Sequence, residues 1–275
     1  MAITKAIPAS PLLQPSIYSS HYFLNLQFPT HSLSTICKRN SLFQGINSRH
    51  SFPKYLNVTA TKVDAVYYSH EVKKRGADIS SELKGTSIFL VGMKSSLKSS
   101  TGKLLADALR YYYFDSDSLV EEVAGGASAL KSYRETDEKG FLQSETEVLK
   151  QLSSMGRLVV CAGDGGVQSS TNLALLRHGI SLWIDVPLEL LASEGHTSTS
   201  HPEVVVTQLI ETYEKMRGGY ATADATISLQ TEVCGKLGYD ELDSVTTEDM
   251  ALEILKELEK LTRVKKMMEE AARPF

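Results

Sequence analysis

The chain has 275 residues, of which 29 are Lys or Arg and 33 are Asp or Glu, and its net charge at pH 7 is -4. This acidic balance argues against nucleic acid as a partner, because phosphate backbones are bound by clustered Lys and Arg. No stretch approaches the roughly 18 consecutive apolar residues of a transmembrane helix, so we expect no membrane span.

The first 63 residues have the composition of an organelle targeting segment. They contain six basic residues, many Ser and Thr, and no Asp or Glu. This composition is typical of a transit peptide, and its richness in Ser rather than Arg favours the plastid. We expect residues 1–63 to be disordered and the mature protein to lie in the chloroplast stroma; an ordinary disordered tail is the alternative. Without this segment, 23 basic and 33 acidic residues remain, a net charge of -10.

Residues 64–84 are polar and predict a short lead-in helix and linker. After them, apolar runs alternate with amphipathic helical segments. The runs that predict buried strands are 88–91, 157–162, 180–186 and 225–229. Strands that alternate with helices imply a parallel sheet covered on both faces. We therefore predict one α/β domain over residues 85–272.

A strand, a loop and a helix follow one another around residues 88–99 in the order of a phosphate-binding loop. The apolar run 88–91 precedes Gly92, and helical spacing begins at Ser99. In the signature G-x-x-x-x-G-K-[ST], the second Gly lets the backbone turn its N-H groups around the phosphates. Gly92, Lys98 and Ser99 match this signature, but Leu97 stands in place of that Gly.

Leu97 is expected to damage the phosphate loop in two ways. A left-handed backbone at a non-Gly residue costs roughly 1–2 kcal/mol, and the Leu side chain would obstruct a phosphate. Two interpretations remain for the neighbouring polar residues. Ser99 or Ser100 caps the helix, or Lys98 and Ser99 retain weak anion binding at its N-terminus.

Several segments in order give the chain a family resemblance. They are YYYFDSDSLVEE (111–122), GFLQSETEVLKQL (140–152), VVCAGDGGVQ (159–168), LWIDVPLELLA (182–192) and KLGYDELDSVTTEDMALEIL (236–255). Over residues 85–263 the chain resembles shikimate kinases, the plant plastid forms above all. The resemblance implies a P-loop kinase-type fold with three layers, a central parallel sheet of about five strands, and an ancestral ATP- and Mg²⁺-dependent phosphotransferase activity.

The motif Phe114-Asp115-Ser116-Asp117 is intact. The resemblance implies that Asp115, with the Ser99 hydroxyl, lies on the magnesium side, and that Asp117 serves the substrate or acts as a base. Carboxylates one residue apart on a strand point to opposite faces, so they share a site only if the chain turns between them. The alternative is that this motif caps the following helix.

Other positions that the resemblance assigns to the substrate have changed. Leu142 stands where the family has the Arg that clamps the substrate carboxylate. Glu145 is retained, but alone it is expected to be a solvated helix residue. Gly163 and Gly165 are expected to keep a turn that contacts the substrate, whereas Asp164 between them would repel a phosphate and an acidic guest.

The connection that forms a lid in the family has also lost its cation. Residues 193–203 contain no Arg, so they cannot close the site with positive charge. His196 and His201 in this connection read as solvated residues. Arg217 stands three residues before Tyr220, where the family spacing is four, and we do not count it as retained.

The last helix is predicted over residues 247–272, with a cap formed by Thr246 and Asp249. Val264, Met267 and Met268 form either a surface for an unknown protein partner or a frayed polar tail.

The sequence thus predicts a shikimate kinase-like protein that is not an active enzyme. No cofactor is expected, and a vestigial Mg-ATP site would bind ATP and shikimate weakly or not at all. The resemblance implies a role in chloroplast development. The alternatives are a nucleotide-binding sensor and a phosphotransferase that uses Lys98, Ser99, Asp115 and Asp117 on a small molecule other than shikimate.

Overall fold

The computed structural model describes residues 62–195, 202–235 and 245–273, all of which belong to the compact unit Asn47–Phe275. The targeting segment predicted over residues 1–63 lies almost wholly outside the described residues, as do His196 and His201.

Five parallel strands form the centre of this unit. They are β1 (Ile88–Val91), β2 (Tyr112–Asp115), β3 (Leu158–Cys161), β4 (Ile180–Asp185) and β5 (Ala225–Ser228), in the spatial order β2-β3-β1-β4-β5. All four residues of β1 and of β3 are buried, as expected for strands covered on both faces. The predicted α/β class and the five-stranded parallel sheet are confirmed.

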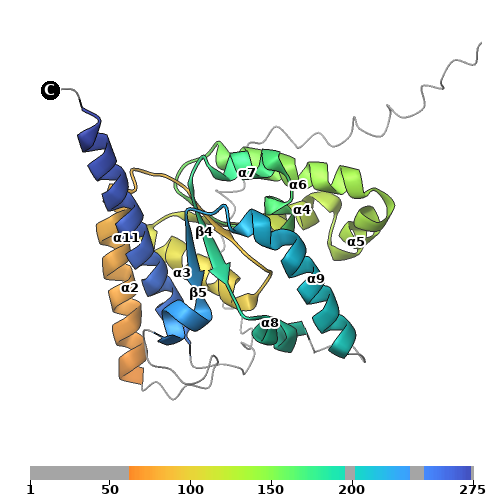
Figure 1. Ribbon diagram of the computed structural model, residues 1–275, viewed down its shortest axis with the longest axis horizontal. Helices are drawn as coiled ribbons and strands as arrows, with labels where there is room; N and C mark the ends of the chain where they lie inside the picture. Colours follow the sequence, from red (N-terminus) through yellow and green to blue (C-terminus); the bar gives the residue numbers. More distant parts are fainter. Residues whose placement is uncertain (1–61, 196–201, 236–244, 274–275) are drawn as a thin grey trace, which may run out of the picture. The chain divides into compact units, whose positions relative to one another are not determined.

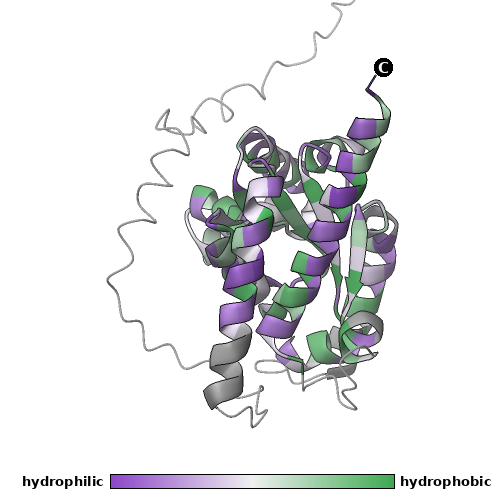
Figure 2. Ribbon diagram, turned by 90° about the vertical axis from the view of Figure 1, so that its left-hand side faces the viewer, coloured by the Kyte–Doolittle hydropathy of each residue, from purple (hydrophilic) through white to green (hydrophobic). Residues whose placement is uncertain are grey.

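Helices cover both faces of the sheet. They are α2 (Lys62–Glu82), α3 (Ser96–Leu109), α4 (Ser116–Ala124), α5 (Ala127–Thr136), α6 (Glu138–Ser153), α7 (Ser170–Leu176), α8 (Leu188–Gly195), α9 (Pro202–Tyr220) and α11 (Thr247–Ala271), with short turns η2 (Asp164–Val167) and η3 (Leu229–Cys234). Helices α2, α3 and α11 pack on one another, and the strands separate them from α6, α7 and α9 (Figure 1). Figure 2 shows the strands mainly in green, the colour of hydrophobic residues, and the helices in both green and purple.

The segment expected as a lead-in helix and linker forms α2, a helix of 21 residues. Its Val72 and Ile79 are buried, and it packs against α3 and α11. Gly76 lies where α2 crosses α3, so close that an added Cβ would stand 2.7 Å from the Ala108 carbonyl oxygen. The structure therefore places this helix within the packed domain.

The final helix begins with the predicted cap. The Asp249 amide donates to the Thr246 hydroxyl, and the Thr246 amide donates to the Asp249 carboxylate, so both ends of the capping box are made. The helix continues regularly to Ala271, so the expectation of a frayed tail is wrong.

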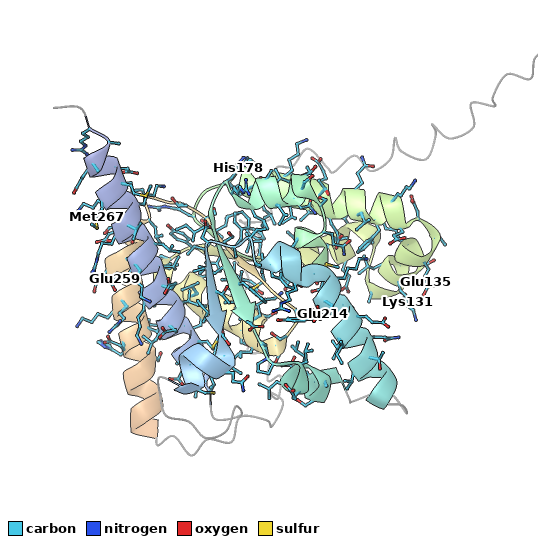
Figure 3. The ribbon with its side chains drawn as sticks, viewed as in Figure 1. Lys131, Glu135, His178, Glu214, Glu259 and Met267 are labelled. Carbon is cyan, nitrogen blue, oxygen red and sulfur yellow. The ribbon has the colours of Figure 1, made fainter. Side chains whose placement is uncertain are left out.

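Beyond the body of the domain, α11 carries exposed apolar side chains. Val264, Met267 and Met268 are 53%, 62% and 68% exposed, and Figure 3 shows Met267 on the outer side of α11. The protein partner expected at this surface stays a prediction. Within the part of the chain that the structure describes, no helix is long and apolar enough to cross a bilayer.

The crossing of α2 and α3 gives a first prediction. Gly76→Ala should lower the free energy of unfolding by about 1–3 kcal/mol, because the new methyl group meets backbone atoms of Ala108 that cannot move away. The control is Gly218→Ala in α9, where an added Cβ has no neighbour within 4 Å. That change should stabilise by about 0.5–1 kcal/mol. Urea unfolding of both variants measures the contrast, and stabilisation by both would contradict the packing.

Candidate phosphate-loop site

The candidate site lies at the carboxyl edge of the sheet. Gly92 follows β1, Asp115 ends β2 and Ala162 follows β3. Since all strands are parallel, their carboxyl ends meet at one edge, which is where α/β folds bind ligands. The structure therefore brings the phosphate loop, the two carboxylates of the Asp-Ser-Asp motif and the glycine-rich turn together.

Position 92 requires glycine for two reasons, its backbone conformation and the lack of room for a side chain. Its φ is +130°, which L side chains rarely adopt, and an added Cβ would collide with the Ile184 carbonyl oxygen. The turn predicted at Gly92 is confirmed.

The helix after the loop begins earlier than expected. Ser95, in an extended conformation with φ of -149°, caps α3 by accepting a hydrogen bond of 3.1 Å from the Lys98 amide. Leu97 then lies in the first helical turn and is not among the residues with positive φ. The expected strain at Leu97 and the expected cap at Ser99 or Ser100 are therefore wrong, because a Ser cap replaces the turn that would need Gly.

Lys98 is turned inward and hydrogen-bonded to the protein backbone. Only 3% of it is exposed, and Nζ donates to the carbonyl oxygens of Gly92 at 2.6 Å and Ala162 at 3.0 Å. A buried ammonium is tolerated only where acceptors replace its water. Lys98 therefore ties the loop after β1 to the loop after β3.

The other donors at the start of α3 are also engaged. The Ser96 amide donates to the Glu194 carboxylate, the Lys98 amide to Ser95 Oγ, and the Ser99 amide to the Ser95 carbonyl. The Ser99 bond is the first regular bond of the helix, so the Ser96 and Lys98 amides are the two first-turn donors that have taken other acceptors within the protein. A phosphate bound by these two amides would have to displace Glu194 and Ser95.

The chain turns between Asp115 and Asp117, where β2 ends and α4 begins. Asp115 is the last residue of β2 and caps α4 by accepting a hydrogen bond of 3.0 Å from the Ser118 amide. Asp117 lies in the first turn of α4, and its carboxylate is 4.0 Å from Lys94 Nζ. Burial raises the pKa of Asp117, and the neighbouring Asp115 and Asp164 raise it further, whereas Lys94 and Lys98 lower it.

The two retained glycines make room for carboxylates. A Cβ on Gly163 would collide with the Asp117 carboxylate, and one on Gly165 would collide with the Glu145 carboxylate. Glu145 is only 7% exposed, so its expected solvation is wrong. Gly163 has an ordinary φ of -71°, which shows that space rather than conformation requires glycine there.

Asp164 has a partner that the sequence did not reveal. The hydroxyl group of the fully buried Tyr220 donates to Asp164 Oδ1 at 3.3 Å and lies 3.8 Å from the Met93 sulfur. The Tyr220 ring stacks on Trp183 with ring centroids 5.8 Å apart. Burial and the Asp164 charge raise the pKa of Tyr220, so it stays a hydrogen-bond donor at neutral pH. Asp164 therefore joins α9 to the glycine-rich turn.

Leu142 supplies no cation to this site, and Arg217 acts on Asp185, the last residue of β4. Burial raises the pKa of Asp185 and of Tyr213, and the nearby Arg217 charge opposes both rises. Leu142 is half-buried on α6, one turn before Glu145.

Ser99 and Asp115 are the residues to which the resemblance assigns Mg²⁺. No group of three His, Cys, Asp or Glu side chains among the described residues is arranged to hold a metal ion. The Mg²⁺ role of Ser99 and Asp115 stays a prediction, and Asp115 already uses one carboxylate oxygen for the α4 cap.

The strand order, the loop between β1 and α3, and the buried Lys98 define a P-loop kinase-type protein. A model of the shikimate kinase family matches residues 94–233, and the chain belongs to this family.

Curated relatives agree with this assignment. The chain is 63% identical over 207 residues to "Probable inactive shikimate kinase like 1, chloroplastic" of Arabidopsis thaliana, a match that covers 74% of this chain and 73% of that one. It is 38% identical over 200 residues to "Shikimate kinase 2, chloroplastic" of Oryza sativa subsp. japonica, covering 68% and 65%.

Solved structures support the fold. The shikimate kinase from Acinetobacter baumannii in complex with shikimate aligns with a TM-score of 0.54 and 24% identity, over 66% of this chain and 96% of that one. The shikimate kinase from Bacteroides thetaiotaomicron aligns with a TM-score of 0.53 and 20% identity, over 63% and 98%.

The contact between Tyr220 and Asp164 gives a second prediction. Tyr220→Phe should lower the free energy of unfolding by about 1–2 kcal/mol, since Asp164 loses its donor. In an Asp164→Ala background the same change should have little effect, because the acceptor is already gone. Tyr213→Phe is the matched control on the same helix. Equal effects of Tyr220→Phe in both backgrounds would show that the hydroxyl group acts elsewhere.

The buried Asp117 gives a prediction about pH. Its pKa in the folded protein is raised above the ordinary value of 3.8, so the folded state keeps a proton that the unfolded state releases as pH rises. The contribution of Asp117 to the stability of the wild type therefore falls as pH rises above about 3.8, and Asp117→Asn should escape this loss. Urea unfolding from about pH 3.5 to pH 7 should show a growing advantage of the variant. The exposed control Asp78→Asn should show no such growth; a constant difference for Asp117→Asn would refute the burial argument.

Proposed function

We propose that this member of the shikimate kinase family does not transfer phosphate and acts in the plastid stroma through binding, in the biogenesis of the chloroplast. The observation that carries the proposal is the internal engagement of the phosphate loop. Lys98 donates to two backbone carbonyls, and Ser95 and Glu194 occupy amides at the start of α3.

The electrostatics of the site support the loss of an acidic substrate. Asp117 and Asp164 are close enough that the charge of Asp164 raises the pKa of Asp117, and Glu145 packs against the same glycine-rich turn. Leu142 offers no charge to a substrate carboxylate, and residues 193–203 contain no Arg. An anionic guest would therefore meet carboxylates and little compensating charge.

The size of the expected loss follows from the number of missing contacts. Removing one charged contact to a transition state costs about 2–4 kcal/mol, or roughly a hundred- to a thousandfold in rate. Three such contacts are affected: the amide donors near Lys98 are engaged, Leu142 replaces the Arg of the family, and residues 193–203 contain no Arg. We expect these losses together to leave no measurable phosphotransfer.

The similar proteins and the composition of the amino-terminal segment support the location and the inactivity. The 63% identical Arabidopsis protein is named as probably inactive and chloroplastic. Residues 1–63 contain no acidic residue. Plastid transit peptides are likewise poor in acidic residues. Chloroplast biogenesis is the part of the proposal that rests on family resemblance alone.

A nucleotide-binding sensor is the second candidate. It is favoured by Gly92, Lys98 and Ser99, which keep their positions in the phosphate-loop signature. Binding of Mg-ATP would have to pull Lys98 away from the Gly92 and Ala162 carbonyls. A sensor would show a rise in melting temperature with Mg-ATP that is lost in Lys98→Ala.

The purified protein should therefore show no turnover of Mg-ATP with shikimate or with a panel of small acids, and no Mg-ATP-dependent rise in melting temperature. An active shikimate kinase assayed in parallel is the positive control. Turnover that disappears in Lys98→Ala would overturn the proposal in favour of a phosphotransferase; a Lys98-dependent thermal shift without turnover would favour the sensor.

Restoring the loop alone should not restore activity. Ser95→Gly with Leu97→Gly removes the α3 cap and reopens the loop, but Leu142, Asp164 and a connection without Arg remain. Adding Leu142→Arg tests whether the clamp is limiting, and we still expect less than about a thousandth of the rate of an active kinase.

A further inference from the structure

A carboxylate of the protein itself is bound at the start of α3. Glu194, near the end of α8, accepts hydrogen bonds from the Ser96 amide at 2.8 Å and from the Ser96 hydroxyl at 2.7 Å, one with each carboxylate oxygen. Ser96 is the first residue of α3. The two residues are 98 positions apart in the sequence, so a tertiary contact and not local geometry brings them together.

The donors that hold Glu194 are those that a phosphate would use. The first amides of a helix lack partners within the helix and point outward, and the helix dipole adds partial positive charge there. For this reason phosphates and carboxylates bind at helix N-termini. Glu194 supplies two oxygens and a negative charge to this position, as a phosphate oxyanion would.

The element that carries Glu194 is also informative. Helix α8 follows β4 directly and packs against α9 (Figure 1). It leads into the connection 193–203, which has acidic residues at positions 194 and 203 and no Arg. Glu194 at the end of α8 thus presents a negative charge to the start of α3.

We propose that Glu194 is an intramolecular latch that fastens α8 to the phosphate loop and excludes oxyanions such as inorganic phosphate from the N-terminus of α3. The latch deepens the proposed function, because it names the contact that keeps the phosphate loop closed. It rests on that function in one respect, namely that no substrate phosphate normally displaces the Glu194 carboxylate.

The latch is reversible. Glu194 and Ser96 are both exposed, so water and dissolved ions reach the contact and weaken it. Lys98, in contrast, is held inside by two carbonyl oxygens. Release of Glu194 would therefore open the Ser96 donors while the inner part of the loop stays closed.

The test titrates inorganic phosphate, at constant ionic strength and without nucleotide, into wild type, Glu194→Gln and the control Glu189→Gln. Glu189 lies on the same helix and is exposed, so its substitution makes the same change in net charge. Chemical shifts of the Ser96 and Leu97 amides report binding at the helix start. Glu194→Gln should bind phosphate about tenfold more tightly than wild type, and Glu189→Gln should match wild type.

Hydrogen exchange without phosphate provides a second measurement. The Ser96 amide should exchange faster in Glu194→Gln than in wild type and in Glu189→Gln, because it has lost its charged acceptor. Equal phosphate affinities of wild type and Glu194→Gln, or unchanged exchange at Ser96, would overturn the latch. An equal gain in both variants would show an effect of bulk charge and would overturn it as well. ATP turnover by the wild type would instead overturn the proposed function, and the phosphate titration would still decide the latch.

Discussion

The whole site depends on the two hydrogen bonds that hold the ammonium group of Lys98 inside the protein. They join the Gly92 carbonyl, after the central strand β1, to the Ala162 carbonyl, after β3. In a phosphate loop the lysine at this position contacts the substrate. Here Lys98 fixes the loop after β1 to the loop after β3. Because the ammonium is already solvated by backbone dipoles, its attraction for a phosphate competes with contacts that hold the fold.

Around this pair of bonds, polar residues contact one another. Tyr220 donates to Asp164, Ser95 accepts from the amide of Lys98, and Glu194 accepts from Ser96. Each contact joins the carboxyl edge of the sheet to a helix that borders it. These contacts help to hold the shikimate kinase fold together at the carboxyl edge of its sheet.

Much of the fold could be predicted from the sequence because its signals are local. The β-branched runs gave β1, β3, β4 and β5, and the Thr246-x-x-Asp249 pattern gave the start of α11. The site was harder to predict. The loss of Gly at position 97 suggested strain, but a Ser cap two residues earlier removes it, and only the backbone conformation shows which serine caps the helix. The contacts of Glu194 and Tyr220 join residues 98 and 56 positions apart, which no local pattern reports.

The packing of helix α2 also limits how far the chain can be shortened from its amino-terminal side. Its Val72 and Ile79 are covered by α3 and α11, and Gly76 fits against Ala108 without any gap for a larger side chain. A protease that trimmed the chain into this helix would uncover the apolar side of its neighbours and leave a surface prone to aggregation. A chain shortened from its amino-terminal side would keep this packing only if the cut fell before these residues.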